Sequence, residues 1–153
     1  MSRPFAVSCI VPIEGKVLFV RHTYGVGKGR ILIPGGYLKE DELPSQAASR
    51  ELLEETGVVA KPRALFSVRA KAGQWILVLT MDYIEGTPKS DGCENSEVLL
   101  LTPEEAIVRP DITNMSRSIM RAYLENPDHV IPLSEDVPPT YDPERYEFYG
   151  ISL

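Results

Sequence analysis

Three glutamates, Glu51, Glu54 and Glu55, lie within five consecutive residues of the segment PSQAASRELLEETG. In a helix, carboxylates spaced i, i+3 and i+4 repel one another and cost roughly 0.2–0.5 kcal/mol per pair. A chain that places acids so closely usually has a cation to bind there. Carboxylate oxygens suit Mg²⁺ or Mn²⁺, which complete their coordination with water and phosphate oxygens. The segment therefore predicts a divalent-metal site.

The predicted helix carries its acids on one side. At about 100° per residue, the three glutamates lie within an arc of about 100°. Leu52 and Leu53 lie outside this arc and are expected to anchor the helix on the rest of the protein. Arg50 precedes Glu54 by about one helical turn and can hold its carboxylate in one rotamer. An isolated cluster of this kind is more often a solvated acidic face than a metal site. The choice between the two therefore depends on the wider pattern of residues around the cluster.

That wider pattern is a fixed array of nine residues: Gly36, Glu42, Arg50, Glu51, Leu52, Glu54, Glu55, Gly57 and Val58. With average residue frequencies, such an array arises by chance in a chain of this length on the order of once in 10⁷. It resembles, position for position, the signature of the Nudix hydrolases, which cleave nucleoside diphosphates linked to another moiety. Asp41 stands where many members have glycine, at a position outside the invariant set.

The resemblance implies an α/β fold, namely an α/β/α sandwich with a mixed β-sheet and a catalytic loop-helix. The implied metal ligands are the carbonyl of Gly35 and the carboxylates of Glu51, Glu54 and Glu55. Arg50 and Glu42 would hold the loop and the helix together. The implied cofactor is Mg²⁺ or Mn²⁺.

The implied reaction is attack by water on a phosphorus of a diphosphate bridge, with metal ions neutralising phosphate charge. Glu51, Glu54 and Arg50 are the candidate catalytic residues, and Glu51 is the first candidate for the general base. Glu97, just before an expected strand, is the second candidate base and a further candidate metal ligand. Glu94 and Asp91 are nearby competitors for that role.

The segment Tyr24–Arg30 is rich in glycine but lacks the Lys-Ser or Lys-Thr pair of a phosphate-binding P-loop. It is expected to be a flexible connection between strands, from which Arg21 or Lys28 contacts substrate phosphates. Trp75 begins an apolar strand and is expected in the core rather than as a platform for base stacking. The expected substrate is a small nucleotide, and a nucleoside triphosphate and a nucleotide sugar remain equally good candidates.

A hairpin of two strands and a third, short strand are expected before the acidic segment. Phe5–Ile13 and Lys16–Arg21 are rich in β-branched residues and predict a hairpin that turns at Glu14-Gly15. A short strand, Ile31–Ile33, follows and is expected to be broken by Pro34-Gly35-Gly36. The carboxylate helix is expected from Pro44 to about Thr56, with Gly57 in a left-handed conformation as its stop.

Further elements follow that helix. Strands are expected at Ala64–Arg69, Trp75–Tyr83 and Val98–Leu101. Thr102 and Glu105 predict a capping box that starts a second helix. A third helix is expected at Ile112–Leu124. Strands, one helix, more strands and then helices predict a mixed sheet with helices on its faces.

The 153 residues predict one main domain at 1–125 and a proline- and aromatic-containing C-terminal extension at 126–153, packed on the same domain. The alternative for the extension is a segment that covers the active site or a partner subunit.

No stretch predicts a membrane span or a signal peptide, and two cysteines without metal-ligand spacing fit a reduced cytoplasm. A homodimer is expected from the resemblance.

A formal net charge of −6 argues against a stable nucleic-acid partner. Three function hypotheses remain open. The first is a metal-dependent pyrophosphohydrolase acting on a small nucleotide. The second is a nucleotide-sensing module of the same fold without turnover, although such modules usually lose signature carboxylates. The third is a hydrolase acting on RNA 5′ ends.

Overall fold

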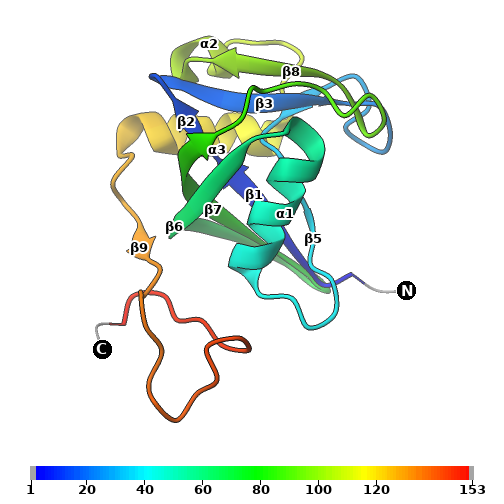
Figure 1. Ribbon diagram of the computed structural model, residues 1–153. Helices are drawn as coiled ribbons and strands as arrows, with labels where there is room; N and C mark the ends of the chain where they lie inside the picture. The colour runs from blue at the N-terminus through cyan, green and yellow to red at the C-terminus, as the bar shows by residue number, and fades with distance from the viewer. Residues whose placement is uncertain (1–2, 152–153) are drawn as a thin grey trace.

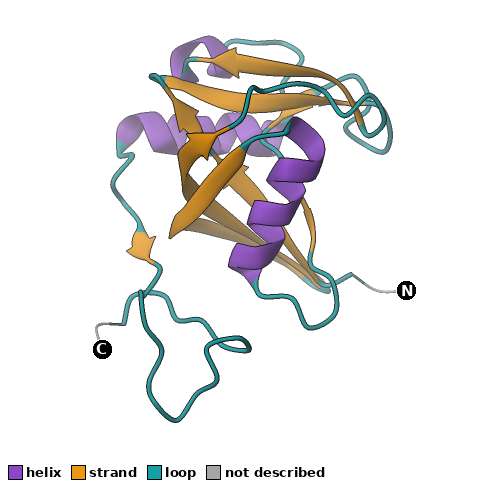
Figure 2. Cartoon of the chain, in the orientation of Figure 1, coloured by secondary structure: helices purple, strands orange, loops and turns teal. Residues whose placement is uncertain are grey.

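The computed structural model describes residues 3–151 and shows an α/β/α sandwich (Figure 1, Figure 2). The elements are β1 (Phe5–Ile10), β2 (Pro12–Ile13), β3 (Lys16–His22), β4 (Ile31–Leu32), β5 (Gly35–Tyr37), α1 (Pro44–Thr56), β6 (Val59–Lys71), β7 (Gln74–Glu85), β8 (Asn95–Leu101), α2 (Pro103–Ile107), α3 (Asn114–Glu125) and β9 (Ile131–Pro132). The larger sheet has the strand order β5-β1-β7-β6-β9. It is mixed, because β1 and β7 are parallel whereas β6 and β7 are antiparallel. The predicted fold class is confirmed.

The larger sheet separates two cores. Successive residues of a strand point to opposite faces, so Cys9 packs into the core beneath α1 whereas Ile10 packs into the core beneath α2 and α3. Figure 1 shows α1 and α3 on opposite sides of this sheet. Ala47 and Ala48, both fully buried, let the α1 backbone approach the sheet closely. The acidic helix is therefore fixed against a packed layer.

The predicted strand Phe5–Ile13 is wrong as a single element. It divides at Val11, so that β1 joins the larger sheet and β2 pairs with β3 in a smaller sheet that also contains β4 and β8. Pro12 has no N–H to donate to a continued ladder, which suits a change of sheet at this point. The predicted turn is confirmed, with Glu14 at φ 50° and Gly15 at φ 80°.

The predicted bounds of α1 are confirmed, including Gly57, which has φ 73° and donates its N–H to the Leu53 carbonyl at 2.9 Å. The expectation that both leucines anchor the helix is half wrong. Leu52 is fully buried, whereas Leu53 is 51% exposed. At about 100° per residue, Leu53 lies opposite the buried arc, which runs from Ala47 to Leu52 and includes Ala48. Glu55 lies inside that buried arc, so the acidic and packed arcs of the helix overlap.

Three other expectations need adjustment. The expected break before Gly35 is confirmed, since β4 ends at Leu32, but Gly35 and Gly36 start a new strand, β5, which pairs with β1. The third helix begins at Asn114, since Ile112 bridges Ile31 and Thr113 caps the helix. Trp75 is 53% exposed rather than in the core. The predicted capping box of Thr102 and Glu105 is confirmed.

The C-terminal segment returns to the domain at two places. β9 pairs with β6, and Tyr149 packs against the core beneath α1. The Glu147 carboxylate accepts the Ser45 N–H at 3.1 Å and the Tyr149 hydroxyl at 2.6 Å. The N-cap residue of α1 is Leu43, which offers no side-chain acceptor. Glu147 therefore supplies the negative charge that the first turn of α1 lacks.

Candidate metal centre

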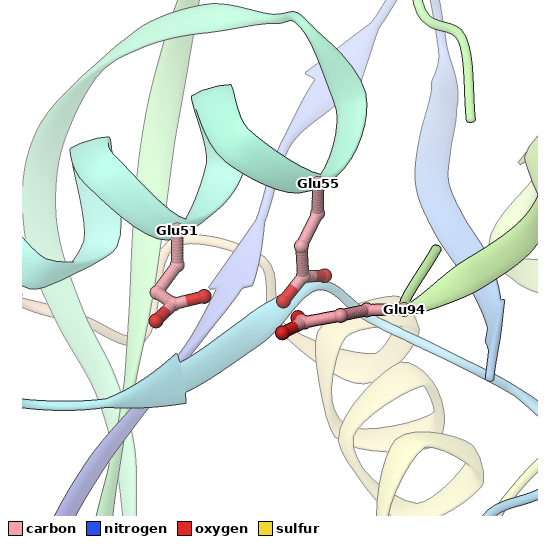
Figure 3. A group of neighbouring side chains, drawn as sticks. All are labelled: Glu51, Glu55 and Glu94. Atoms are coloured by element: carbon pink, nitrogen blue, oxygen red, sulfur yellow. The ribbon is translucent and has the colours of Figure 1, made fainter. Parts of the chain in front are cut away.

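Three carboxylates meet beside the C-terminal half of α1. Glu51 and Glu55 come from α1 and Glu94 comes from the loop before β8, and each offers an oxygen within 4.8 Å of the others (Figure 3). Figure 3 shows the three side chains pointing toward one another. Three hard oxygen donors from two segments form a donor set suited to a divalent cation.

Glu55 is the buried member of this group. It is 4% exposed, and its Oε2 has no hydrogen-bond partner among the described residues. Burial, followed by the charges of Glu51 and Glu94, raises its pKa to about 9, and a backbone hydrogen bond with Gly35 opposes the shift. A buried carboxylate oxygen without a donor is costly. A cation among the three carboxylates would remove that cost, so the residues present fit a metal ion.

Glu51 lies between Glu55 and Arg50. Arg50 Nη1 donates to its carboxylate at 2.8 Å, yet burial raises the Glu51 pKa against the effect of this guanidinium. A Cβ on Gly36 would lie 2.3 Å from Cδ of Glu51. The glycine at position 36 therefore makes the space that the Glu51 carboxylate occupies.

Arg50 organises the start of the site. It donates through Nε and Nη2 to Glu42 at 2.8 and 2.9 Å, and through Nη2 to the Tyr37 carbonyl at 3.0 Å. The pairing with Arg50 holds the pKa of Glu42 below its usual range. Arg50 thus ties the loop before α1 to β5, as expected for a residue that holds the loop and the helix together.

Glu54 lies apart from the three-carboxylate group. Its side chain is 55% exposed, and its carboxylate accepts a bond from Arg50 Nη1 at 3.3 Å. It faces solvent next to the site, so its predicted role as a ligand stays a prediction. Gly35 lies in β5 opposite Ser8, and its backbone lowers the pKa of Glu55 against the effect of burial.

The structure does not bring Glu97 to the carboxylate group. Glu97 pairs with Arg21 across β3 and β8, and its carboxylate accepts from Arg21 Nε at 3.2 Å. Arg21 Nη1 also donates to Asp111 at 2.9 Å and to the Gly29 carbonyl at 2.8 Å. Arg21 thus has three acceptors within the protein, and its expected contact with substrate stays a prediction. Lys28 is exposed in the adjoining loop.

Glu94, the alternative to Glu97 in the sequence analysis, lies beside the α1 carboxylates instead, and the expected ligand role of Glu97 stays a prediction. The register shift between Arg21 and His22 in the β3–β8 ladder falls just after Glu94 along the chain, and a strand pattern alone does not reveal such a shift. Sequence reasoning also missed Asn95, which is 1% exposed and donates from Nδ2 to the Glu55 carbonyl at 2.8 Å. A buried amide at the first residue of a strand that follows a polar loop has no sequence signature.

The NUDIX domain model matches residues 2–123. A curated relative is Phosphatase NudJ of Escherichia coli K12, 43% identical over 70 residues, which are 46% of this chain and 42% of that protein. The chain thus matches less than half of that relative's length.

Solved structures of similar fold include members of the same family. A NUDIX hydrolase from Nitrosomonas europaea has a TM-score of 0.73 at 25% identity, covering 84% of this chain and 74% of that one. The Escherichia coli ORF135 protein has a TM-score of 0.66 at 23% identity, covering 84% and 93%, a likeness of fold. Among residues 3–151, no helix is both long and apolar enough to cross a membrane.

Proposed function

Because this chain belongs to the Nudix hydrolase family, we propose that it is a divalent-metal-dependent hydrolase that cleaves a diphosphate bond in a nucleoside diphosphate linked to another moiety. The observation that carries the proposal is the meeting of Glu51, Glu55 and Glu94, in which Glu55 keeps a buried oxygen that no donor within residues 3–151 reaches. The proposed cofactor is Mg²⁺ or Mn²⁺, both of which prefer oxygen ligands.

In this proposal Glu51, Glu55 and Glu94 hold the metal, with Glu54 and the Gly35 carbonyl as further candidate ligands. The bound ion would neutralise phosphate charge and lower the pKa of a water molecule. Glu51 is the proposed general base. Arg50 donates to its Oε1 at 2.8 Å, and its Oε2 can then accept a proton from water. Arg50 acts by orienting Glu51 rather than by contact with substrate.

Metal-dependent turnover separates this proposal from its alternatives. A panel of nucleoside triphosphates, nucleotide sugars and 5′-triphosphorylated RNA, incubated with Mg²⁺ and followed by phosphorus NMR, should show cleavage of the small nucleotides. Binding seen as a thermal shift without any product would instead support a sensing module. Turnover confined to the RNA would support the RNA-end alternative, which the net charge of −6 disfavours.

We further propose that the substrate carries a planar base, because an aromatic pair lies next to the carboxylates. His22 and Tyr24 stack with ring centroids 5.2 Å apart and an interplanar angle of 15°. Thr23 between them donates its N–H to the Glu94 carbonyl at 3.1 Å, which fixes the pair beside the metal centre. Tyr24 is 52% exposed, and burial of the rest of the ring together with Glu94, Glu55 and Glu51 raises its pKa. A neutral, half-exposed ring suits stacking on a base.

Tyr24→Leu is expected to raise KM for base-bearing diphosphates about tenfold with little change in kcat, since stacking one base on an aromatic ring contributes roughly 1–3 kcal/mol. Tyr24→Phe retains the ring and should keep wild-type KM. The measurement is steady-state hydrolysis of a nucleoside triphosphate and of inorganic triphosphate. An equal rise in KM for the base-free compound would contradict base stacking at this residue.

A further inference from the structure

The loop from Thr87 to Glu94 closes over the C-terminal end of α1. The last carbonyls of a helix have no partner within the helix and need donors from elsewhere. Lys89 donates its N–H to the Thr56 carbonyl at 2.9 Å. Asn95 donates from Nδ2 to the Glu55 carbonyl at 2.8 Å. The loop is therefore fastened to the helix end that carries the metal-binding residue Glu55.

Asn95 is itself held from several sides. It is 1% exposed, its N–H donates to the Asp91 carboxylate at 3.1 Å, and its carbonyl accepts from the Ser90 hydroxyl at 2.8 Å. These bonds fix the backbone of Asn95. Because the Asn95 backbone is fixed in this way, its side-chain amide is held in position to donate to the Glu55 carbonyl.

Two consecutive residues thus meet two parts of Glu55. The Asn95 amide bonds the Glu55 main-chain carbonyl, and the Glu94 carboxylate approaches the Glu55 carboxylate within 4.8 Å. Two carboxylates at this distance repel each other when both are ionised. The bond from the Asn95 amide joins two neutral groups, so it can hold the Glu94 loop at α1 whether or not a metal is bound. Thr23 assists by donating its hydroxyl to the Cys93 carbonyl at 2.7 Å.

We propose that Asn95 is a positioning residue of the metal centre: its amide fastens the Glu94 loop to the main chain of Glu55, so that the third carboxylate is in place before the ion binds. This inference rests on the proposed function, in which Glu94 is a metal ligand. Residues that orient metal ligands typically change metal affinity by about 10–100-fold when replaced.

The test is binding of Mn²⁺ alone to the full chain, measured by calorimetry and by electron paramagnetic resonance. Asn95→Leu removes the donor at similar volume and should weaken Mn²⁺ binding about tenfold. Asn95→Ala leaves room for a water at the Glu55 carbonyl and serves if the leucine variant does not fold. Glu94→Gln should weaken binding at least as much. The double variant should bind no more weakly than Glu94→Gln alone, because Asn95 acts through Glu94.

The outcomes are distinguishable. If Glu94→Gln weakens binding while both Asn95 variants bind Mn²⁺ as the wild type does, the role of Asn95 is overturned and the metal site stands. Losses that add in the double variant would show a general structural role and would also overturn it. If Glu94→Gln binds normally, the assignment of Glu94 as a ligand fails, and with it the premise of the inference.

Discussion

Glu55→Gln is expected to lower metal-dependent turnover by about 10³-fold, roughly 4 kcal/mol of transition-state stabilisation, and to make the metal-free protein more stable above neutral pH. The first effect follows because a neutral amide is a far weaker ligand for Mg²⁺ than a carboxylate. The second follows because Glu55 is 4% exposed and one of its oxygens has no hydrogen-bond partner in the part of the chain that the structure describes. Glutamine keeps the shape of the side chain without the buried charge. The measurements are kcat/KM with Mg²⁺ and thermal unfolding in a chelator.

The pH dependence has a definite sign. Burial and the charges of Glu51 and Glu94 raise the Glu55 pKa from 4.5 to about 9 on folding. The favourable contribution of protonated Glu55 is complete below pH 4.5 and is lost as the pH rises toward 9. The metal-free wild type should lose several degrees of Tm between pH 6 and pH 9, as expected for a loss of a few kcal/mol. The Glu55→Gln protein should lose less.

Glu54→Gln is the matched control for stability. Its side chain is 55% exposed and bonded only to Arg50 among the described residues. It should change Tm by less than about 2 °C, since surface substitutions usually stay within ±0.5 kcal/mol. As a candidate ligand, it is also expected to lower turnover. Near wild-type rates for Glu55→Gln would contradict the metal centre, and near wild-type rates for Glu54→Gln would remove only Glu54 from the ligand set.

Local sequence signals predicted the catalytic helix well. Proline is favoured in the first turn of a helix and glycine just past its end. Pro44 and Gly57 therefore predicted the bounds of α1 that the structure shows. Family membership also followed from the signature, because its spacing is specified residue by residue. Such information is local and needs no knowledge of which strands pair.

Tertiary pairing decided what the sequence left open. The division of the first strand at Val11 depends on which sheet each half joins, and Phe5–Ile13 alone reads as one apolar run. The choice between Glu94 and Glu97 depends on the register shift in the β3–β8 ladder. Leu53 illustrates the same limit on a helix: spacing groups residues into arcs, but only packing shows which arc is buried.

Gly36→Ala is the second substitution with a large expected effect. The new Cβ would lie 2.3 Å from Cδ of Glu51 and 2.5 and 2.6 Å from its carboxylate oxygens. These atoms end a flexible side chain, so Glu51 can move aside and the protein should fold. In moving, the carboxylate leaves both the 2.8 Å bond from Arg50 and its place beside Glu55. Turnover should fall by about 10²–10³-fold, because displacement of about 1 Å at a catalytic group costs on the order of 10²-fold.

Gly35→Ala is the neighbouring control, and it should fail differently. A Cβ at position 35 would lie 2.1 Å from the Val7 carbonyl oxygen, a backbone atom of β1 that cannot move aside alone. Neither glycine has a positive φ, so the contrast comes from space and not from backbone conformation. Gly35→Ala should lower Tm by about 10 °C or prevent folding, as overpacking by 3 kcal/mol or more does. Thermal unfolding and kcat/KM measured on both variants test the pair. An active Gly36→Ala enzyme would contradict the proposal that turnover needs the Glu51 carboxylate in its place beside Glu55.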